Sequence, residues 1–276
     1  MMRSPLAGIG QIYFQASPWY GGLLLGCLYL MAPPMAAGCL LGVCAATGTA
    51  WALDFPVRER KAGVYGFNGA LSGAGLCVAW QFNVALLCWI TLAGILTALL
   101  ARAMERHKLP PLTFLFVLVM WAAAALGPAF GLEPLPAGAA PACTLAPLSY
   151  VFCTFGQASF AAATPVGLLL LVALAKVRWQ WGAWAAGGAA MAWSALGLAG
   201  QVAPAGQVAQ LGAAAGVNCS LVALGLSVRE CDWRWRCVGA AVCFALCVAG
   251  VGLGRALYTL PFVLSVWLVL AARRAK

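Results

Sequence analysis

Long stretches without charge dominate this chain. Residues 4–53, 62–101 and 179–228 contain no Asp, Glu, Lys or Arg, and shorter uncharged stretches fill most of the remaining sequence. Hydrophobic residues make up 64% of the chain and charged residues only 8%, and the mean hydropathy is +0.94. A soluble fold could not bury so much apolar surface, whereas each helix that crosses a bilayer needs about 20 apolar residues. The sequence therefore predicts an all-α integral membrane protein.

Three blocks of glycine, polar and aromatic residues occur twice in the same order, displaced by 146 to 150 positions. The pairs are Gly10/Gly156, Gln11/Gln157 and Phe14/Phe160, then Gly66/Gly216, Asn68/Asn218, Leu71/Leu221, Gly75/Gly225 and Leu76/Leu226, then Thr113/Thr259, Phe116/Phe262, Val117/Val263, Leu118/Leu264 and Trp121/Trp267. This order predicts two related halves, repeat 1 over residues 1–127 and repeat 2 over 148–276, joined by a linker at 128–147. Repeated halves in membrane proteins usually build one site where they meet.

Charged clusters lie at different places in the two repeats. Repeat 1 carries them at residues 58–61 and 102–108. The equivalent stretches of repeat 2, near 204–210 and 249–255, contain only Arg255. The loops at these equivalent positions are therefore basic in repeat 1 and almost uncharged in repeat 2.

The reverse holds for the other set of loops. Repeat 2 is basic at Lys176, Arg178 and within 229–236, whereas its equivalents near 30–33 and 79–86 carry no charge. Basic loops stay on the cytoplasmic side of a membrane, so equivalent loops are predicted to face opposite sides. The repeat is thus predicted to be inverted, and the net charge of +10 reflects topology rather than binding to nucleic acid.

Five crossings are expected in each repeat, with an external linker and both termini in the cytoplasm. Segments 5–30 and 149–175 are longer than one crossing needs, so part of each is predicted to be a tilted or re-entrant piece that lines a cavity. The crossings are predicted near residues 5–30, 33–53, 62–80, 84–101 and 109–127, and near 149–175, 179–200, 211–228, 237–254 and 256–272.

The twelve cysteines do not indicate a metal site, because none forms a Cys-x-x-Cys pair. Most stand alone in apolar stretches, which predicts small buried thiols packed between helices. Cys231 and Cys237 flank a loop predicted to be cytoplasmic, and we expect them to be reduced. No metal and no cofactor is expected.

No predicted crossing contains an acidic or basic side chain, and the only histidine, His107, lies in the cluster at 102–108. Proton relays and ion-coupled carriers normally keep an ionisable group within the membrane. An enzyme would need an acid, a base, a metal or an activated nucleophile there. These absences predict a transport path for a small uncharged polar solute and argue against an enzyme.

Duplicated amides and hydroxyls are the candidates for that path. Gln11 and Gln157 each precede a phenylalanine by three residues. Either amide could simply cap a broken helix, but an unpaired buried amide is costly in lipid, and its recurrence in register favours a function. Thr113 and Thr259 also recur, although a threonine in a membrane helix commonly bonds to the carbonyl four residues earlier.

Aromatic residues and asparagines recur in the same blocks. Phe14, Phe67 and Phe160 could line the path or pack in the core. Asn68 and Asn218 are predicted mainly to bind loosened backbone near the glycine-rich segments. A structural role is therefore the first expectation for the asparagines.

With these blocks, the chain resembles the urea transporter family in its bacterial type, over nearly its whole length. That family shows a Gly-x-Gly-Gln-x-x-Phe segment, a Gly-Phe-Asn or Gly-Tyr-Asn-Gly block and a repeated Leu-Pro-x-x-Thr-x-Pro-Phe signature. The matching segments are Gly8-Ile9-Gly10-Gln11-Ile12-Tyr13-Phe14, Tyr65-Gly66-Phe67-Asn68-Gly69 and Leu109-Pro110-Pro111-Leu112-Thr113-Phe114-Leu115-Phe116, then Phe155-Gly156-Gln157 with Phe160, Gly216-Val217-Asn218 and Leu257-Tyr258-Thr259-Leu260-Pro261-Phe262.

The resemblance implies a homotrimer in the bacterial inner membrane, with a narrow pore between the inverted halves of every subunit that passes urea down its gradient. It assigns the pore mouths to Gln11 and Gln157, a flat slot to Phe14, Phe67 and Phe160 with Leu71 and Leu221 beside them, and the central constriction to Thr113 and Thr259.

Two departures from the family pattern concern the shape of this path. Val217 stands where the symmetry with Phe67 would place an aromatic ring, so the slot of the second half has one ring fewer. The third signature is also split, with Leu115 and Ala256 in place of prolines. The sequence therefore predicts passive urea transport, with an ion- or proton-coupled carrier of a small polar solute as the alternative.

Overall fold

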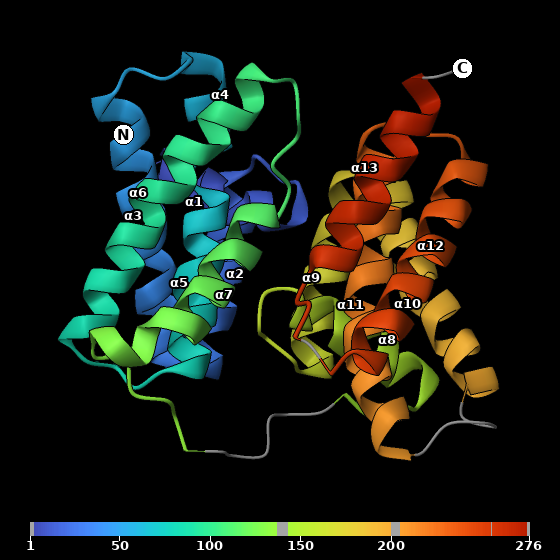
Figure 1. The fold of residues 1–276 in the computed structure, drawn as a ribbon. Helices are drawn as coiled ribbons and strands as arrows, with labels where there is room; N and C mark the ends of the chain where they lie inside the picture. The colour runs from blue at the N-terminus through green and yellow to red at the C-terminus, as the bar shows by residue number, and fades with distance from the viewer. Residues whose placement is uncertain (1–2, 137–142, 200–204, 255, 275–276) are drawn as a thin grey trace. The chain divides into compact units, whose positions relative to one another are not determined.

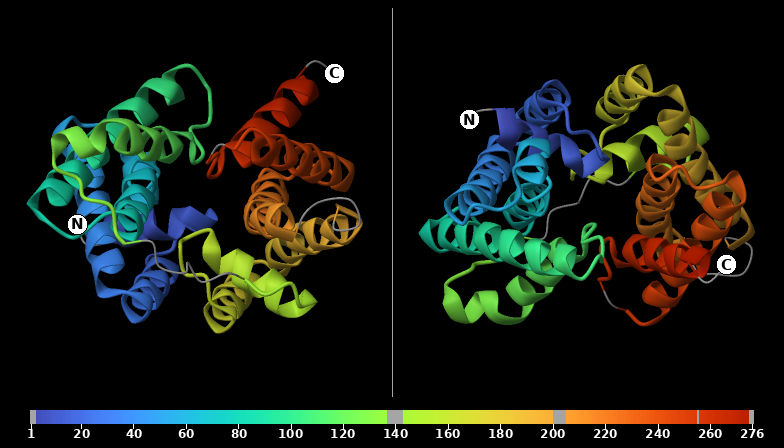
Figure 2. Two further views of the ribbon diagram at one scale, coloured as in Figure 1. Left: turned by 60° about the horizontal axis from the view of Figure 1, so that its bottom comes forward. Right: turned by 90° about the horizontal axis from the view of Figure 1, so that it is seen from above.

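The computed structural model describes residues 3–136, 143–199, 205–254 and 256–274. Apart from one isolated bridge between Trp80 and Pro134, these residues form helices and their connections. Contacts divide the chain into unit 1, Met1–Ala139, and unit 2, Ala140–Lys276. Each unit is a helical bundle (Figure 1), and Figure 2 shows each bundle from two further directions. The all-α prediction is confirmed for the described residues.

Unit 1 contains seven α-helices and two short 3₁₀ helices among its described residues. They are α1 (Arg3–Gly10), η1 (Gln11–Tyr13), α2 (Pro18–Met31), α3 (Pro33–Ala52), α4 (Val57–Ala62), α5 (Phe67–Ala79), α6 (Val84–Arg106), α7 (Phe114–Leu126) and η2 (Gly127–Phe130). The short α5 is almost entirely buried, and it packs against α3, α6 and α7. It is therefore the central helix of this unit.

Unit 2 repeats much of this order. Its helices are α8 (Pro147–Gln157), α9 (Thr164–Val177), α10 (Trp179–Ala199), α11 (Ala205–Val228), α12 (Trp233–Gly252) and α13 (Leu260–Arg274). The central helix here is α11, which packs against α8, α10, α12 and α13.

Four of the described helices are long and apolar enough to cross a bilayer. They span Pro33–Ala52, Val84–Arg106, Gly206–Val228 and Trp233–Gly252. Four shorter apolar helices, α2, α5, α9 and the stretch from Phe114 to Phe130, accompany them. These helices support a membrane protein, and the full count of ten crossings stays a prediction. Of the predicted crossings and linker, residues 137–142 and 200 lie outside the described residues, as do residues 1, 2, 201–204, 255, 275 and 276 of the rest of the chain.

Each long segment that was expected to be one crossing is divided into two helices. In unit 1 the chain breaks after η1 at Phe14, where φ is +60°, and α2 begins at Pro18. In unit 2 it breaks at Phe160, where φ is +66°, before α9 begins at Thr164. A residue with a Cβ seldom adopts this left-handed conformation, so tertiary contacts must hold it. A tilted or re-entrant piece was expected within each of the segments 5–30 and 149–175, and their division into two helices is compatible with that expectation, which stays a prediction.

Glycine allows the two helices of each divided segment to touch through their backbones. A Cβ atom at Gly21 of α2 would lie 1.8 Å from the carbonyl oxygen of Leu6 in α1. A Cβ atom at Gly167 of α9 would lie 1.6 Å from the carbonyl oxygen of Phe152 in α8. No side chain fits at either position, so the same close approach occurs in both units.

The two ends of the predicted linker are each fastened to their own unit. In unit 1 the backbone N–H of Gln81 donates to the carbonyl of Glu133 at 2.8 Å, and that of Leu135 donates to Ala79 at 3.0 Å. In unit 2 a disulfide joins Cys143 to Cys153 in α8. The expectation of buried free thiols is therefore wrong for this pair, whereas most of the remaining cysteines are buried and free.

Candidate functional site

The three duplicated blocks come together inside each unit. In unit 1, η1 and α7 both pack against α5, so the block around Gln11 and the block around Thr113 meet the block around Asn68. In unit 2, α8 and α13 both pack against α11 in the same way. Residues separated by about a hundred positions therefore form one neighbourhood around each central helix.

Asn68 fixes the chain where it enters α7. Its Nδ2 donates to the carbonyl of Leu112 at 2.9 Å, and its Oδ1 accepts from the N–H of Phe116 at 3.1 Å. Leu112 has φ of +46°, so the chain makes a sharp local turn there. The amide thus satisfies a carbonyl before the helix and one of the free N–H groups of its first turn.

Asn218 repeats this arrangement in unit 2. Its Nδ2 donates to the carbonyl of Tyr258 at 2.9 Å, and its Oδ1 accepts from the N–H of Phe262 at 3.0 Å. Tyr258 has φ of +48°, close to the value at Leu112. The expectation that these asparagines bind loosened backbone is confirmed in both units.

The candidate threonines follow directly on these turns. Thr113 precedes the first residue of α7, and Thr259 precedes the first residue of α13. Their side chains are buried, with exposed fractions of 5% and 7%. Each carbonyl accepts the N–H four residues later, from Val117 at 3.1 Å and from Val263 at 3.2 Å. The asparagine and the left-handed residue together set where each threonine lies.

The candidate glutamines stand at the breaks of the divided segments. Gln11 begins η1, is half-buried, and donates from Nε2 to the carbonyl of Ala62 at 3.0 Å. Gln157 ends α8, is also half-buried, and has Oε1 at 3.6 Å from the disulfide sulfur of Cys143. Equivalent amides therefore have different neighbours in the two units.

The candidate aromatic and aliphatic residues lie at the breaks and on the central helices. Phe14 and Phe160 are half-buried, and Phe67 is the half-buried first residue of α5. Three further candidates are buried on the central helices, namely Leu71 on α5 and Val217 and Leu221 on α11.

Gln15 is a polar residue that the duplicated pattern missed. Its side chain is only 4% exposed, and among the described residues its Nε2 has no hydrogen-bond partner. Its counterpart in the other half is Ala161, so a comparison of the halves could not select it. The sequence feature that could have identified Gln15 is its place as a second amide directly after Phe14, where the helix breaks.

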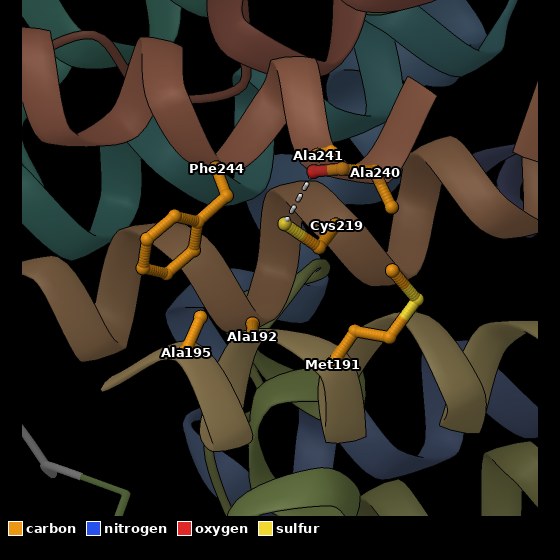
Figure 3. Close-up of a pocket in the computed structure, with 7 residues that line it drawn as sticks. All are labelled: Met191, Ala192, Ala195, Cys219, Ala240, Ala241 and Phe244. Atoms are coloured by element: carbon orange, nitrogen blue, oxygen red, sulfur yellow. Dashed lines mark hydrogen bonds between the residues drawn. The ribbon is translucent and has the colours of Figure 1, made fainter. Parts of the chain in front are cut away.

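A cavity of about 220 Å³ in unit 2 offers a different chemistry from these candidates. It is lined by Met191, Ala192, Ala195, Cys219, Ala240, Ala241 and Phe244, from α10, α11 and α12 (Figure 3). Its one drawn polar contact joins Sγ of Cys219 to the carbonyl of Ala240 at 3.5 Å. Such an apolar lining does not suit a polar solute, which needs hydrogen-bonding groups in place of water.

The candidate residues are all uncharged, and they offer amides, hydroxyls and backbone carbonyls. Within the described part of the chain, no group of three or more His, Cys, Asp or Glu residues could hold a metal ion. The arrangement can therefore exchange hydrogen bonds with a neutral solute, but it provides no acid, base or nucleophile for covalent chemistry.

Comparisons with known proteins agree with this chemistry. The family described as Urea transporter matches residues 2–274. Over 127 residues the chain is 32% identical to proteins named Urea transporter 1 from Ovis aries and Mus musculus, and 30% identical to one from Rattus norvegicus. Each alignment covers 43% of this chain and 32% of the relative, so the matched stretch spans about a third of the length of those relatives.

Proposed function

Since the chain belongs to the urea transporter family, we propose that it passes urea across a membrane by a passive, channel-like route. The observation that carries this proposal is the pair of neutral neighbourhoods around α5 and α11. In both, a buried asparagine fixes the turn before a buried threonine, and both threonines precede an apolar helix. A small polar solute without charge is the ligand that suits such groups.

We further propose that residues 1–127 and 148–276 are inverted repeats joined by an external linker at 128–147, and that each contributes half of one pore. The distribution of charge supports inversion. In unit 1 the basic helix α4 follows the C-terminal end of α3, whereas in unit 2 Arg178 precedes the N-terminal end of the equivalent helix α10. If both basic ends face the cytoplasm, the equivalent helices run in opposite directions.

Within this pore, hydrogen bonds would replace the water that urea loses. Removing an amide-like group from water without a partner costs roughly 2 to 7 kcal/mol, and each restored hydrogen bond returns a net contribution of about 0.5 to 1.5 kcal/mol. Gln11 and Gln157 would receive urea at the two mouths, and Thr113 and Thr259 would contact it at the constriction. An ion would gain far less, because neutral dipoles do not replace its full hydration shell.

Aromatic rings would give the pore its shape. Phe14, Phe67 and Phe160 would form flat walls that accept a planar molecule, with Leu71 and Leu221 beside them. Val217 occupies the place of a fourth ring and would leave the second half of the slot wider. Exclusion of bulkier amides would then depend mainly on the first half.

The assembly and location belong to the same proposal. A homotrimer, the bacterial inner membrane and cytoplasmic termini follow from the family resemblance and from the charge pattern. The relatives named above are mammalian, so the bacterial location rests on the sequence motifs. Neither a cofactor nor nucleic acid has a role in this transport.

The threonines provide the direct test. We expect Thr113→Val and Thr259→Val each to lower urea flux about 3- to 10-fold, the loss that corresponds to one hydrogen bond of about 0.7 to 1.4 kcal/mol. The measurement is stopped-flow light scattering of vesicles that contain the purified protein.

Thr91→Val in α6 is the matched control, because its hydroxyl bonds to the carbonyl of Leu87 in its own helix at 2.8 Å. Normal flux in both test variants would remove the threonines from the path. A proton ionophore should leave the flux of the unmodified protein unchanged. Collapse of urea uptake with the ionophore would instead indicate a coupled carrier.

A further inference from the structure

One end of unit 2 contains a polar cavity that the proposed transport does not use. The cavity has a volume of about 240 Å³ and is lined by Arg178, Gln180, Trp181, Ser227, Glu230 and Arg236. Arg178 lies in the connection between α9 and α10, and the other lining residues come from the start of α10, the end of α11 and the turn after it, and the start of α12. Four helix ends therefore enclose a space with polar walls at the basic end of the unit.

Arg236 is one of the two arginines that line the cavity. It is half-buried in the first turns of α12, and its guanidinium lies over the ring of Trp184 at 4.7 Å. Within the described part of the chain, its buried Nε has no hydrogen-bond partner. Because this Nε is not accessible, a ligand in the cavity would bind the terminal nitrogens of the Arg236 guanidinium.

Arg178 stands on the other side of the same space. Its Nη1 lies 3.3 Å from Oε1 of Glu230, and these side chains are 48% and 74% exposed. Such an exposed ion pair contributes little to stability, so an incoming anion can replace the carboxylate at low cost. The guanidinium groups of Arg178 and Arg236 then both face one anion, and Ser227 and Gln180 add neutral donors.

The wider surroundings are strongly positive. Arg229 donates to the carbonyl of Gly225 at 3.2 Å, and Nη1 of Arg273 lies 2.8 Å from the sulfur of Cys231. The charged residues near this end are Lys176, Arg229, Arg234, Arg273 and Arg274, against Asp232 in addition to Glu230. The field at the cavity therefore attracts anions.

The charged residues that line this cavity are not repeated in the other half of the chain. The positions equivalent to Arg178, Glu230 and Arg236 are Ala32, Trp80 and Leu86 in repeat 1, none of them charged. The arginines at the basic end of unit 1 already have internal carboxylates. Arg60 pairs with Asp54 at 2.8 Å, and Arg102 pairs with Glu105 at 2.8 Å. The Nε of Arg60 is buried without a hydrogen-bond partner, as is that of Arg236, so the difference between the units lies in the cavity and in the internal carboxylates.

We propose that this cavity binds a phosphate group, as the headgroup of an anionic phospholipid or as free phosphate. Guanidinium groups match phosphate oxygens in geometry and charge. Trp179 and Trp233, exposed to 69% and 60%, flank the site as expected at a membrane–water interface. Basic pockets between membrane helices bind phospholipid headgroups in this manner. The site is independent of urea transport.

Binding can be measured with the full protein in neutral detergent. The unfolding temperature is recorded with phosphatidylglycerol, with phosphatidylcholine and with inorganic phosphate, and native mass spectrometry gives the affinity for the first lipid. We expect phosphatidylglycerol or inorganic phosphate to stabilise the protein, and Arg236→Gln to weaken that ligand at least about tenfold, as the loss of one charged hydrogen bond predicts. Arg58→Gln, at an exposed arginine of α4, should leave the affinity unchanged.

Two further variants keep the test decisive if Arg236→Gln does not fold. Arg178→Gln should weaken the same ligand, whereas Glu230→Gln should strengthen it about 2- to 5-fold, because the competing carboxylate is removed. A response to phosphatidylglycerol alone identifies a lipid site, and a response to inorganic phosphate as well identifies a site for the free anion. Equal affinities in the unmodified protein, Arg178→Gln and Glu230→Gln would overturn the proposal.

Discussion

Units 1 and 2 build the surroundings of their threonines in the same way but pack their outer helices differently. Asn68 and Asn218 bind the same two backbone groups, and the residues before both threonines have φ within a few degrees of one another. Both divided segments also break at a left-handed phenylalanine. The features shared by the two units thus concentrate around the proposed path.

The outer packing shows the contrast. In unit 1 a Cβ atom on Gly94 of α6 would lie 2.7 Å from the carbonyl oxygen of Gly42 in α3, so these helices touch through their backbones. The position equivalent to Gly94 in unit 2 is Ala240, which lines the apolar cavity between α10 and α12. Ala240 carries a methyl group where Gly94 has none, and α10 and α12 pack less closely at this position than α3 and α6 do. The two units therefore agree around their buried threonines and differ where these outer helices meet.

The asparagines should give the largest effect. We expect Asn68→Ala and Asn218→Ala each to lower the free energy of unfolding by about 2 to 5 kcal/mol, because each leaves two backbone groups without their amide partner. Unfolding in mixed micelles, followed by circular dichroism, measures the loss. Asn83→Ala is the control. Asn83 caps α6 and otherwise makes an exposed hydrogen bond of 3.3 Å to the carbonyl of Gly131, so its loss should cost about 1 kcal/mol. A cost at Asn218 no larger than at Asn83 would show that the two units are not equivalent here.

An intermediate effect on stability is expected when the same alanine-to-leucine substitution is made at equivalent positions of the two units. Ala46 is fully buried, and its Cβ would lie 2.9 Å from a Cβ on Gly69, so Ala46→Leu should destabilise unit 1 by about 1 to 3 kcal/mol. Ala192 lines the cavity of about 220 Å³, so Ala192→Leu should change the stability by less than about 1 kcal/mol. The same unfolding measurement compares them. Equal losses would contradict the difference in packing between the units.

Val217→Phe tests selectivity, and the change that it should cause in total urea flux is the smallest of these effects. The added ring would make the second half resemble the first, so we expect urea flux to persist while the entry of methylated ureas falls several-fold. Stopped-flow measurements with both solutes provide the ratio. Val238→Phe, at a position that is 48% exposed, controls for the larger side chain. An unchanged ratio would place the slot of the second half elsewhere.

Much of this architecture could be predicted from the sequence, because duplication and hydropathy are patterns that extend over many residues and can be recognised without the structure. The helices and the backbone-binding role of Asn68 and Asn218 are examples. The left-handed conformation of Phe14 could not be predicted, because no local preference of phenylalanine favours it and only tertiary contacts impose it. The grouping of the candidate residues around α5 and α11 also could not be predicted, because it depends on the fold. Their part in transport stays a proposal.

Other features were hidden for different physical reasons. The pairing of Cys143 with Cys153 depends on how the chain approaches α8, which the spacing of cysteines alone does not give. Arg178 and Arg236 were interpreted only as topology signals, since the cavity between them forms from four helix ends. Gln15 corresponds to Ala161 in the other half, which is not polar, so a search for repeated polar residues did not find it.

The two anchored ends of the linker bear on how the halves are held as one molecule. Glu133 and Leu135 bond to residues 79–81, and Cys143 is tied to α8, so each half keeps its own stub of connecting chain. On this basis the halves need not be continuous, and two separately translated polypeptides, cut between the stubs, should be able to reassemble.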